Sequence, residues 1–298
     1  MNDYNKAFGI KDQLEFTAGP GGMPVAKVRN ELGEAEIALQ GAHVLNYKAR
    51  GQEAIIWMSD QATYAPGKSL RGGVPICWPW FGPHASDASL PGHGPARTVD
   101  WKPVASETQP DGSTKVSFEM TESEKVRTMY AHPLRVQLHV TVGCSLRLEL
   151  ETTNLGKGPF TLGEALHTYF IVGDVRLAHV EELDGCEYID KMDGGVRKQQ
   201  HGPVSISEET DRIYLGTGSH AEIIDPTMGR KIIIESQGSA SMVVWNPWAK
   251  TAEKMGDLGA DGYLKMLCVE TTNAADDVVE LAPGASHRMV AEYSSESI

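Results

Sequence analysis

Cysteine is scarce in this chain: only Cys77, Cys144, Cys186 and Cys268 occur among its 298 residues. They lie far apart and form no CxxC pair, so their spacing predicts no metal site. Reduced thiols in a cytoplasmic protein are the interpretation that this pattern favours. A disulfide between two of them stays open.

Positive charge and long apolar runs are also in short supply. The formal net charge is −13 at pH 7, whereas a nucleic acid or an anionic membrane surface requires a basic face. No apolar run approaches the roughly 20 residues of a membrane span. Residues 1–16 lack the basic start and apolar core of a signal peptide. We therefore expect a cytoplasmic protein with neither nucleic acid nor membrane as a partner.

Helical periodicity is rare, and apolar residues alternate with polar ones instead. Residues 134–142 and 146–151 alternate on either side of a turn at Gly143, which is typical of a half-buried antiparallel hairpin. The turn signal DPTMG at 225–229 separates two more strands. Many short strands with turn residues between them predict an all-β sandwich or barrel, which we expect to form one domain over residues 1–298. Further strands are predicted at 35–47, 115–120, 160–170, 221–225, 231–236, 241–245, 263–271 and 287–293.

One short helix is expected at 121–131. Thr121 would cap its N-terminus, because Glu124 follows three residues later in the spacing of a capping box. Pro133 limits the length of the helix.

The segment from Ser69 to Arg97 differs from the rest of the chain in composition and charge. It contains SLRGGVPICWPWFGPH and LPGHGPAR, in which Gly and Pro are too frequent for a helix or a central strand. Aromatic side chains and fixed charges in an irregular segment indicate a shaped loop, where binding and catalysis tend to occur. Between residues 61 and 97 three cations stand against one anion, Asp87, a local balance of +2. This favours a small anionic ligand.

The segment TLGEALHTYF at 161–170 carries a candidate acid or base. In a strand, His167 shares a face with the small residues Gly163 and Ala165, which leaves room for a ligand. An imidazole with an ordinary pKa of about 6.5 can give or take a proton near neutral pH. A histidine packed for structural reasons is the alternative.

The segment YLKMLCVETTNA at 263–274 carries a candidate carboxylate. Leu264, Met266, Cys268 and Glu270 share one strand face, so Glu270 ends an otherwise apolar row. Its carboxylate lies either in water at the rim of the sheet or partly desolvated in a cleft, where its pKa would rise. Desolvated carboxylates in clefts are candidates for function.

Two further segments offer groups that suit a sugar. VVWNPW at 243–248 places Trp245 and Trp248 around an Asn-Pro turn. Aromatic faces beside polar groups are a common way to bind sugars, and two rings that cap the core are the alternative. EETDRIY at 208–214 contributes Asp211, which alone would be read as part of a charged loop.

Taken together, these segments resemble the hexose-6-phosphate mutarotases (glucose-6-phosphate 1-epimerases) of the aldose 1-epimerase superfamily. The matching pieces occur in the family's order, from about residue 69 to residue 274: SLRGGVPICWPWFGPH, LPGHGPAR, LGEALHTYF, ETDRIY, VVWNPW and CVETTNA. The resemblance implies a galactose mutarotase-like β-supersandwich, a large antiparallel fold that agrees with the alternation above. We expect a monomer whose partner is a small-molecule sugar phosphate.

The resemblance also implies which residues are catalytic. His167 would be the general acid that protonates the ring oxygen of the sugar. Glu270 would be the general base that takes the proton from the anomeric hydroxyl. His93 would line the sugar site and is a second candidate for the acid.

The remaining matches imply substrate contacts. Arg71 and Arg97 would hold the phosphate, and Asp211 would bind sugar hydroxyls. Two positions depart from the pattern: Gly92 stands where relatives often carry Gln, and Pro95 stands where a large apolar residue is frequent. Both lie close to Arg97 in the sequence, so the phosphate contacts are where we expect this chain to differ.

The chemistry agrees with these residues without the resemblance. Anomer exchange needs a base for the C1 hydroxyl and an acid for the ring oxygen, and it requires no metal, cofactor or nucleophile. We therefore predict a hexose-6-phosphate 1-epimerase, an isomerase without metal or cofactor. Two alternatives stay open: an aldose 1-epimerase acting on free sugars, and a non-catalytic sugar-phosphate-binding protein on the same fold.

Overall fold

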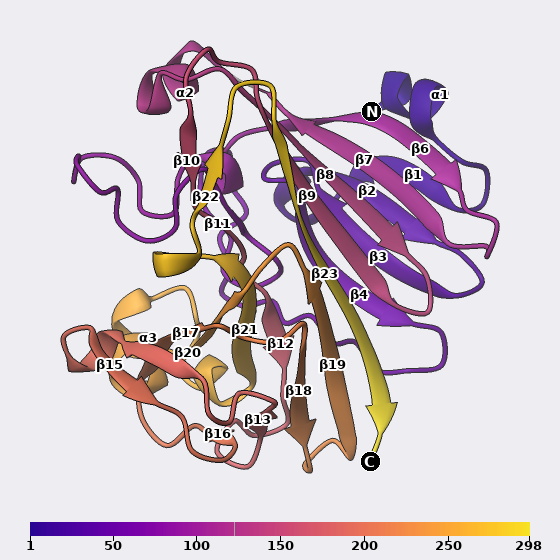
Figure 1. Cartoon of the computed structure of the whole chain (residues 1–298). Coiled ribbons are helices and arrows are strands. Elements are labelled where there is room, and N and C mark those ends of the chain that lie inside the picture. The colour runs from indigo at the N-terminus through magenta and orange to yellow at the C-terminus, as the bar shows by residue number, and fades with distance from the viewer. Residues whose placement is uncertain (122) are drawn as a thin grey trace.

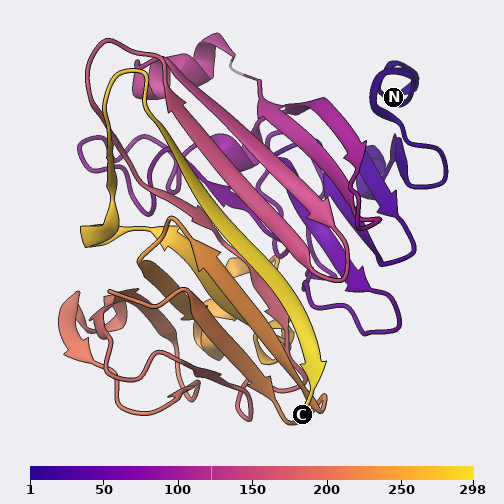
Figure 2. The same cartoon turned by 45° about the vertical axis from the view of Figure 1, so that its right-hand side comes forward.

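Antiparallel strands dominate the structure, a computed structural model that describes residues 1–121 and 123–298. Figure 1 shows long strands running across the molecule from β6 to β18, with β1–β4 behind one end of this layer. The view in Figure 2 shows the same layer as one continuous twisted sheet. The predicted all-β antiparallel fold is confirmed.

The largest sheet has nine strands in the order β16-β13-β18-β19-β23-β9-β8-β7-β6. Its β8 and β9 form the hairpin predicted around Gly143, with Val142 opposite Leu146. The DPTMG turn joins β18 to β19, as predicted. The strands are β6 Trp101–Thr108, β7 Thr114–Met120, β8 Leu134–Val142, β9 Leu146–Asn154, β13 His179–Glu181, β16 Val204–Ser205, β18 His220–Asp225, β19 Arg230–Gln237 and β23 Ser286–Ser297.

The second large sheet has eight strands. Seven follow the order β15-β14-β17-β20-β21-β11-β5. The eighth, β12, pairs with β21 beside the part of β21 that pairs with β11. Strands from distant parts of the chain are therefore neighbours in it. The strands are β5 Ile76–Cys77, β11 Glu164–Leu166, β12 Tyr169–Ile171, β14 Glu187–Asp190, β15 Val196–Gln199, β17 Thr210–Leu215, β20 Ser241–Asn246 and β21 Met266–Asn273.

Two small sheets and a few short helices complete the described residues. The first sheet consists of β1 Leu14–Ala18, β2 Pro24–Arg29, β3 Gly33–Ala38 and β4 His43–Ala49, and the second of β10 Phe160–Leu162 and β22 Val279–Leu281. The α-helices are α1 Asn2–Phe8, α2 Glu124–Tyr130 and α3 Trp248–Met255. Short 3-10 helices lie at Pro20–Gly22, Ala96–Thr98, Lys191–Asp193, Gly262–Leu264 and Ala275–Asp277. In the described part of the chain, no helix is both long and apolar enough to cross a membrane.

One buried apolar cluster joins three of the sheets. It includes Leu138 of the nine-stranded sheet, Ile37 of the four-stranded sheet and Val269 of the eight-stranded sheet, each at most 1% exposed. The period-two pattern of the sequence produces this arrangement, because every second residue of a strand points inward.

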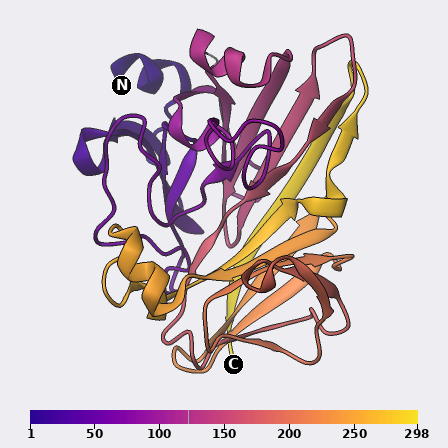
Figure 3. The ribbon, with the colours of Figure 1, turned by 90° about the vertical axis from the view of Figure 1, so that its left-hand side faces the viewer.

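Figure 3 shows the irregular purple segment between β4 and β6 on the same side of the molecule as the orange helix α3.

Three predicted strands differ from the structure, two because they are divided and one because it begins later. The segment 35–47 is interrupted at 39–42 between β3 and β4, and the strand predicted at 263–271 begins only at Met266. The segment 160–170 is split into β10, β11 and β12. The split arises because β10 pairs with β22, whereas β11 pairs with β5 and β21.

The expected helix at 121–131 exists as α2, but its predicted cap is wrong. The hydroxyl of Ser123 accepts the N–H of Val126 at 3.2 Å and is the N-cap. Thr121 instead donates its backbone N–H to the carbonyl of Asp100 at 2.9 Å, so it extends the strand contacts of β7. Within the predicted range, Glu122 lies outside the described residues.

A buried carboxyl group lies between the two large sheets. Glu164 of β11 is fully buried, and its Oε2 accepts a hydrogen bond from Thr152 of β9 at 3.2 Å. Thr152 in turn accepts the indole N–H of Trp78 at 3.0 Å. Burial raises the pKa of Glu164 from 4.5 to about 8, and the hydrogen bond from Thr152 opposes this shift.

The raised pKa of Glu164 predicts a pH dependence of stability. Between pH 4.5 and 8 the unfolded chain gives up this proton while the folded protein keeps it, so stability falls as pH rises. Glu164→Gln removes the titratable group. As pH rises across this window, the free energy of unfolding of the variant minus that of wild type should increase by up to about 1.4 kcal/mol per pH unit. Urea unfolding at several pH values measures the difference, and parallel curves for the two proteins would contradict the assignment.

Candidate active site

One face of the eight-stranded sheet collects the polar residues that the sequence marked. Along β21, Leu267 and Val269 point into the core, whereas Cys268 and Glu270 point to the opposite face. Cross-strand pairing places Val243 of β20 beside Glu270 and Trp245 beside Cys268. The predicted sharing of one face by Met266, Cys268 and Glu270 agrees with this arrangement, and Leu264 lies outside the strand.

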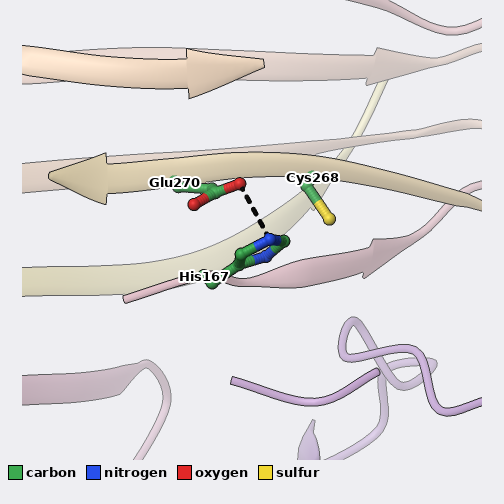
Figure 4. A group of neighbouring side chains, drawn as sticks. All are labelled: His167, Cys268 and Glu270. Atoms are coloured by element: carbon green, nitrogen blue, oxygen red, sulfur yellow. Dashed lines mark ion pairs between the residues drawn. The ribbon is translucent and has the colours of Figure 1, made fainter. Parts of the chain in front are cut away.

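His167 and Glu270 face each other across two strands. Leu166 is paired with Thr271 and Tyr169 with Cys268, so the same register places His167 opposite Glu270. His167 Nε2 lies 3.3 Å from Glu270 Oε1, and Figure 4 shows the two side chains pointing toward each other. Residues 103 positions apart in the chain thus form one pair.

Both members of the pair are removed from water. The side chain of Glu270 is 1% exposed and that of His167 is 12% exposed. Glu270 Oε2 and His167 Nδ1 are buried without a hydrogen-bond partner. Of the two alternatives that the sequence left for Glu270, desolvation is therefore correct and a solvated strand end is wrong.

Burial shifts the two pKa values in opposite directions. It raises the pKa of Glu270 well above 4.5, with a further rise from the nearby Asp211 carboxylate. It lowers the pKa of His167 well below 6.5, and His93 and Arg97 lower it further. Each shift favours the uncharged form of its group. The pair therefore carries one shared proton, because a second proton or none would leave a net charge in a buried place.

Aromatic rings enclose the imidazole of His167. Tyr169 stacks on it at a centroid distance of 5.0 Å and an interplanar angle of 13°. Trp245 meets it edge-on at 5.8 Å, and His93 at 6.0 Å. Trp245 is therefore part of this site, whereas Trp248 packs against the core.

His93 is held in the loop between β5 and β6. Its Nδ1 accepts the backbone N–H of Gly82 at 3.3 Å, so the neutral ring carries its proton on Nε2 as a donor. Burial lowers the pKa of His93 to about 3, with Arg97 and Lys191 adding to the effect. His93 is therefore a neutral hydrogen-bond donor, and the contact with Glu270 distinguishes His167 from it as the candidate acid. The loop is closely packed, since a Cβ at Gly94 would lie 1.9 Å from the carbonyl oxygen of Trp78.

Arg71 reaches the same site but is already engaged. Its Nε binds Asp257 Oδ1 at 2.9 Å, and its Nη1 donates to the hydroxyl of Tyr169 at 3.1 Å. Asp257 follows α3, so this ion pair ties the α3 segment to the loop that precedes β5. Arg71 thereby also steadies the ring that stacks on His167.

Arg97 lies next to the two positions that depart from the family's pattern. Its Nη2 donates to the carbonyl of Gly92 at 2.9 Å. A Cβ at Gly92 would meet only the carbonyl oxygen of Gly82, at 3.8 Å, so the backbone leaves room for a side chain there. Pro95 caps the turn Ala96–Thr98 that carries Arg97.

Asp211 brings with it a cation that the sequence analysis missed. Asp211 is paired in register with Trp245, and its Oδ2 lies 3.0 Å from Nζ of Lys191. Lys191 lowers the pKa of Glu270, and this effect is smaller than the rises caused by burial and by Asp211. Lys191 lies in a short turn after β14 with no motif around it, so only the pairing of β14 with β17 could have located it.

The structure therefore brings all six predicted site residues to one region, and their individual roles stay predictions. A separate hollow of about 770 Å³ opens near α1, with Lys27, Arg29, Glu34 and Glu36 among its lining residues. That hollow contains both charge signs and shares no residue with the His167–Glu270 pair. We place the candidate active site at the pair.

Known proteins resemble this chain over most of its length. The family model described as Aldose 1-epimerase matches residues 24–294. A protein of Escherichia coli (strain K12) named "Putative glucose-6-phosphate 1-epimerase" is 37% identical over 244 residues, covering 82% of this chain and 81% of the relative. A protein of the same name from Cenchrus ciliaris is 34% identical, covering 85% and 79%.

A solved structure is similar over the whole chain. The crystal structure of a "putative mutarotase" from Salmonella typhimurium superimposes with a TM-score of 0.89 at 32% identity, and 100% of each chain is covered. Family model, curated relatives and fold all agree. The chain therefore belongs to the aldose 1-epimerase family.

Proposed function

We propose that this protein interconverts the α and β anomers of hexose 6-phosphates such as glucose 6-phosphate. The observation that carries the proposal is the buried His167–Glu270 pair, whose facing atoms lie 3.3 Å apart. Membership of the aldose 1-epimerase family supports the reaction. The names of the curated relatives support a phosphorylated sugar as the substrate.

The spacing of the pair suits the reaction. The C1 hydroxyl oxygen and the ring oxygen O5 are bonded to the same carbon, so they lie side by side and need an acid and a base that are also side by side. Glu270 takes the proton of the C1 hydroxyl while His167 gives a proton to O5. The C1–O5 bond then breaks and the C1–O1 bond becomes the carbonyl of the open-chain aldehyde.

Ring closure reverses the two roles. After rotation about C1–C2, O5 attacks the other face of the aldehyde, His167 takes back its proton and Glu270 returns its proton to O1. The pair holds one proton throughout: transfer from Glu270 to His167 across their 3.3 Å contact prepares the pair for ring opening, and after ring opening the proton count is again one, on Glu270. Burial suits this exchange, because neither step changes the net charge of the pair. A well-placed acid or base typically accelerates such a step by about 10² to 10⁴.

The groups around the pair supply the expected sugar contacts. Trp245 offers an apolar face, and His93 offers its Nε2–H as a donor. Asp211 can accept hydrogen bonds from sugar hydroxyls, because its carboxylate is still 21% exposed beside Lys191. These assignments extend the sequence-based roles to specific atoms.

We assign the phosphate to Arg97 first. Its planar guanidinium can bind two phosphate oxygens, and one of its nitrogens is turned to the Gly92 carbonyl. Arg71 must share its guanidinium with Asp257, which makes it the weaker of the two phosphate ligands. Lys191 adds a third positive charge near the site.

We further propose that the catalytic unit is the whole chain, residues 1–298, acting as a cytoplasmic monomer. The eight-stranded sheet that carries the site contains strands from Ile76–Cys77 to Met266–Asn273, and Ile37 before it and Tyr293 after it belong to the same buried core as Val269 of this sheet. The four cysteines are free thiols, which supports a reducing compartment.

Magnetisation-transfer NMR tests the proposed reaction directly. Glucose 6-phosphate should exchange anomers far faster with the enzyme than in buffer, and free glucose and galactose should exchange much less. Glu270→Gln should lower the enzymatic rate by about 10² to 10⁴ because the base is lost. Equal exchange of free sugars would point to a general aldose 1-epimerase. Line broadening without exchange would point to a binding protein.

The phosphate assignment predicts a selective effect of Arg97→Ala. The KM for glucose 6-phosphate should rise roughly 10- to 100-fold, since a hydrogen bond to a charged group contributes about 1.5–3 kcal/mol. The KM for a free sugar should change little. Lys198→Ala is the matched control, because it removes one positive charge that is paired with Asp190 and Asp193 away from the site. Equal changes for both sugars would overturn the assignment.

A further inference from the structure

A third side chain lies against the catalytic pair and has no part in the proton transfers. His167, Cys268 and Glu270 each offer one ligand atom, and these atoms all lie within 4.8 Å of one another. Figure 4 shows Cys268 and Glu270 projecting from the same strand, β21, toward the imidazole. Among the described residues, this is the group of His, Cys, Asp and Glu side chains that is compact enough to surround a metal ion.

The three donors are of the kinds that zinc prefers, and their spacing is close to what zinc needs. Tetrahedral Zn²⁺ bonds of about 2.0–2.3 Å to N, O and S place neighbouring ligand atoms about 3.3–3.6 Å apart. His167 Nε2 and Glu270 Oε1 already lie 3.3 Å apart. Cys268 Sγ lies within 4.8 Å of both atoms, so zinc binding would have to draw the thiol closer.

The cluster also contains polar atoms that have no partner. Glu270 Oε2 and His167 Nδ1 are buried and form no hydrogen bond, and Cys268 is fully buried. Unpartnered buried polar atoms are costly, and a cation bound by the carboxylate would reduce that cost at Glu270. The register of β12 with β21 holds the donors together, so little rearrangement opposes binding.

We propose that His167, Cys268 and Glu270 form a reversible zinc site, with water in the fourth position. Because zinc would occupy the lone pairs of the acid and the base, it would inhibit anomer exchange, and this inhibitory part rests on the proposed function. The scattered cysteines of the sequence did not predict such a site, since its ligands meet only through strand pairing.

The proton balance makes the proposal quantitative. The empty site holds one proton on the His167–Glu270 pair and one on the thiol of Cys268. Zn²⁺ bound by a thiolate, a carboxylate and a neutral imidazole must displace both protons, so the net charge of the site stays the same.

Calorimetry of the full-length protein with zinc measures this balance. Titrations in two buffers of different ionisation enthalpy should give one zinc per chain and two protons released. Cys268→Ser should release one proton and bind more than about 100-fold more weakly, since loss of even an outer-sphere partner costs about 10- to 100-fold. Cys77→Ser is the matched control, because Cys77 is another buried thiol outside the cluster, and it should bind as wild type does.

Two further readouts keep the outcomes separate. Cobalt(II) should give the thiolate charge-transfer and tetrahedral visible bands in wild type and lose the former in Cys268→Ser. If that variant fails to fold, Glu270→Gln replaces it, again with one proton released. Unchanged zinc affinity in a folded variant, or no proton release, overturns the zinc site.

The inhibition is judged separately. Zinc binding with two protons released but unaltered anomer exchange overturns inhibition alone. A protein without exchange activity refutes the proposed function and leaves the binding result standing.

Discussion

A carboxyl group and an imidazole that are buried together can share one proton at a lower cost than either can carry a charge alone. Glu270 and His167 are in this situation, and the opposite directions of their pKa shifts have the same physical origin. The reaction proposed for this site moves that proton from one group to the other and back. The fold therefore needs to keep two side chains dry and adjacent, and the surrounding structure can be understood as serving that need.

The register of the eight-stranded sheet provides the adjacency, and the loops provide the burial. Strands β11 and β12 flank His167, and both pair with β21, which fixes the imidazole opposite the carboxyl group. His93, in the loop between β5 and β6, meets the His167 ring edge-on at a centroid distance of 6.0 Å. The Arg71–Asp257 ion pair joins this irregular region to the segment after α3 and orients Tyr169 through its hydroxyl. Cationic groups thus surround a pair that itself stays neutral.

Alternation in the sequence was enough to predict the antiparallel fold and the face on which Glu270 lies, because a strand has a fixed period of two. It was not enough to place His167 opposite Glu270. Their contact depends on how two strands pair, and the two residues are 103 positions apart in the sequence. The resemblance supplied that link. Lys191 and Asp257 had no motif to mark them, and each became visible only through a neighbour distant in sequence. Cys268 lies in a matched segment, but its proximity to His167 became visible only through strand pairing. Thr121 was misjudged because a strand contact of its backbone outweighed local capping chemistry.

The pH profile of kcat/KM for anomer exchange tests the shared proton most directly. The 6-phosphate of the substrate ionises with a pKa of about 6. Its titration is measured separately by phosphorus NMR, and the kcat/KM profile is corrected for it. Independent groups with ordinary pKa values would give a bell between 4.5 and 6.5. A buried pair that resists both gaining and losing a proton predicts a wider plateau, with the acid limb below 4.5 and the alkaline limb above 6.5. A bell confined between those two values would contradict the account.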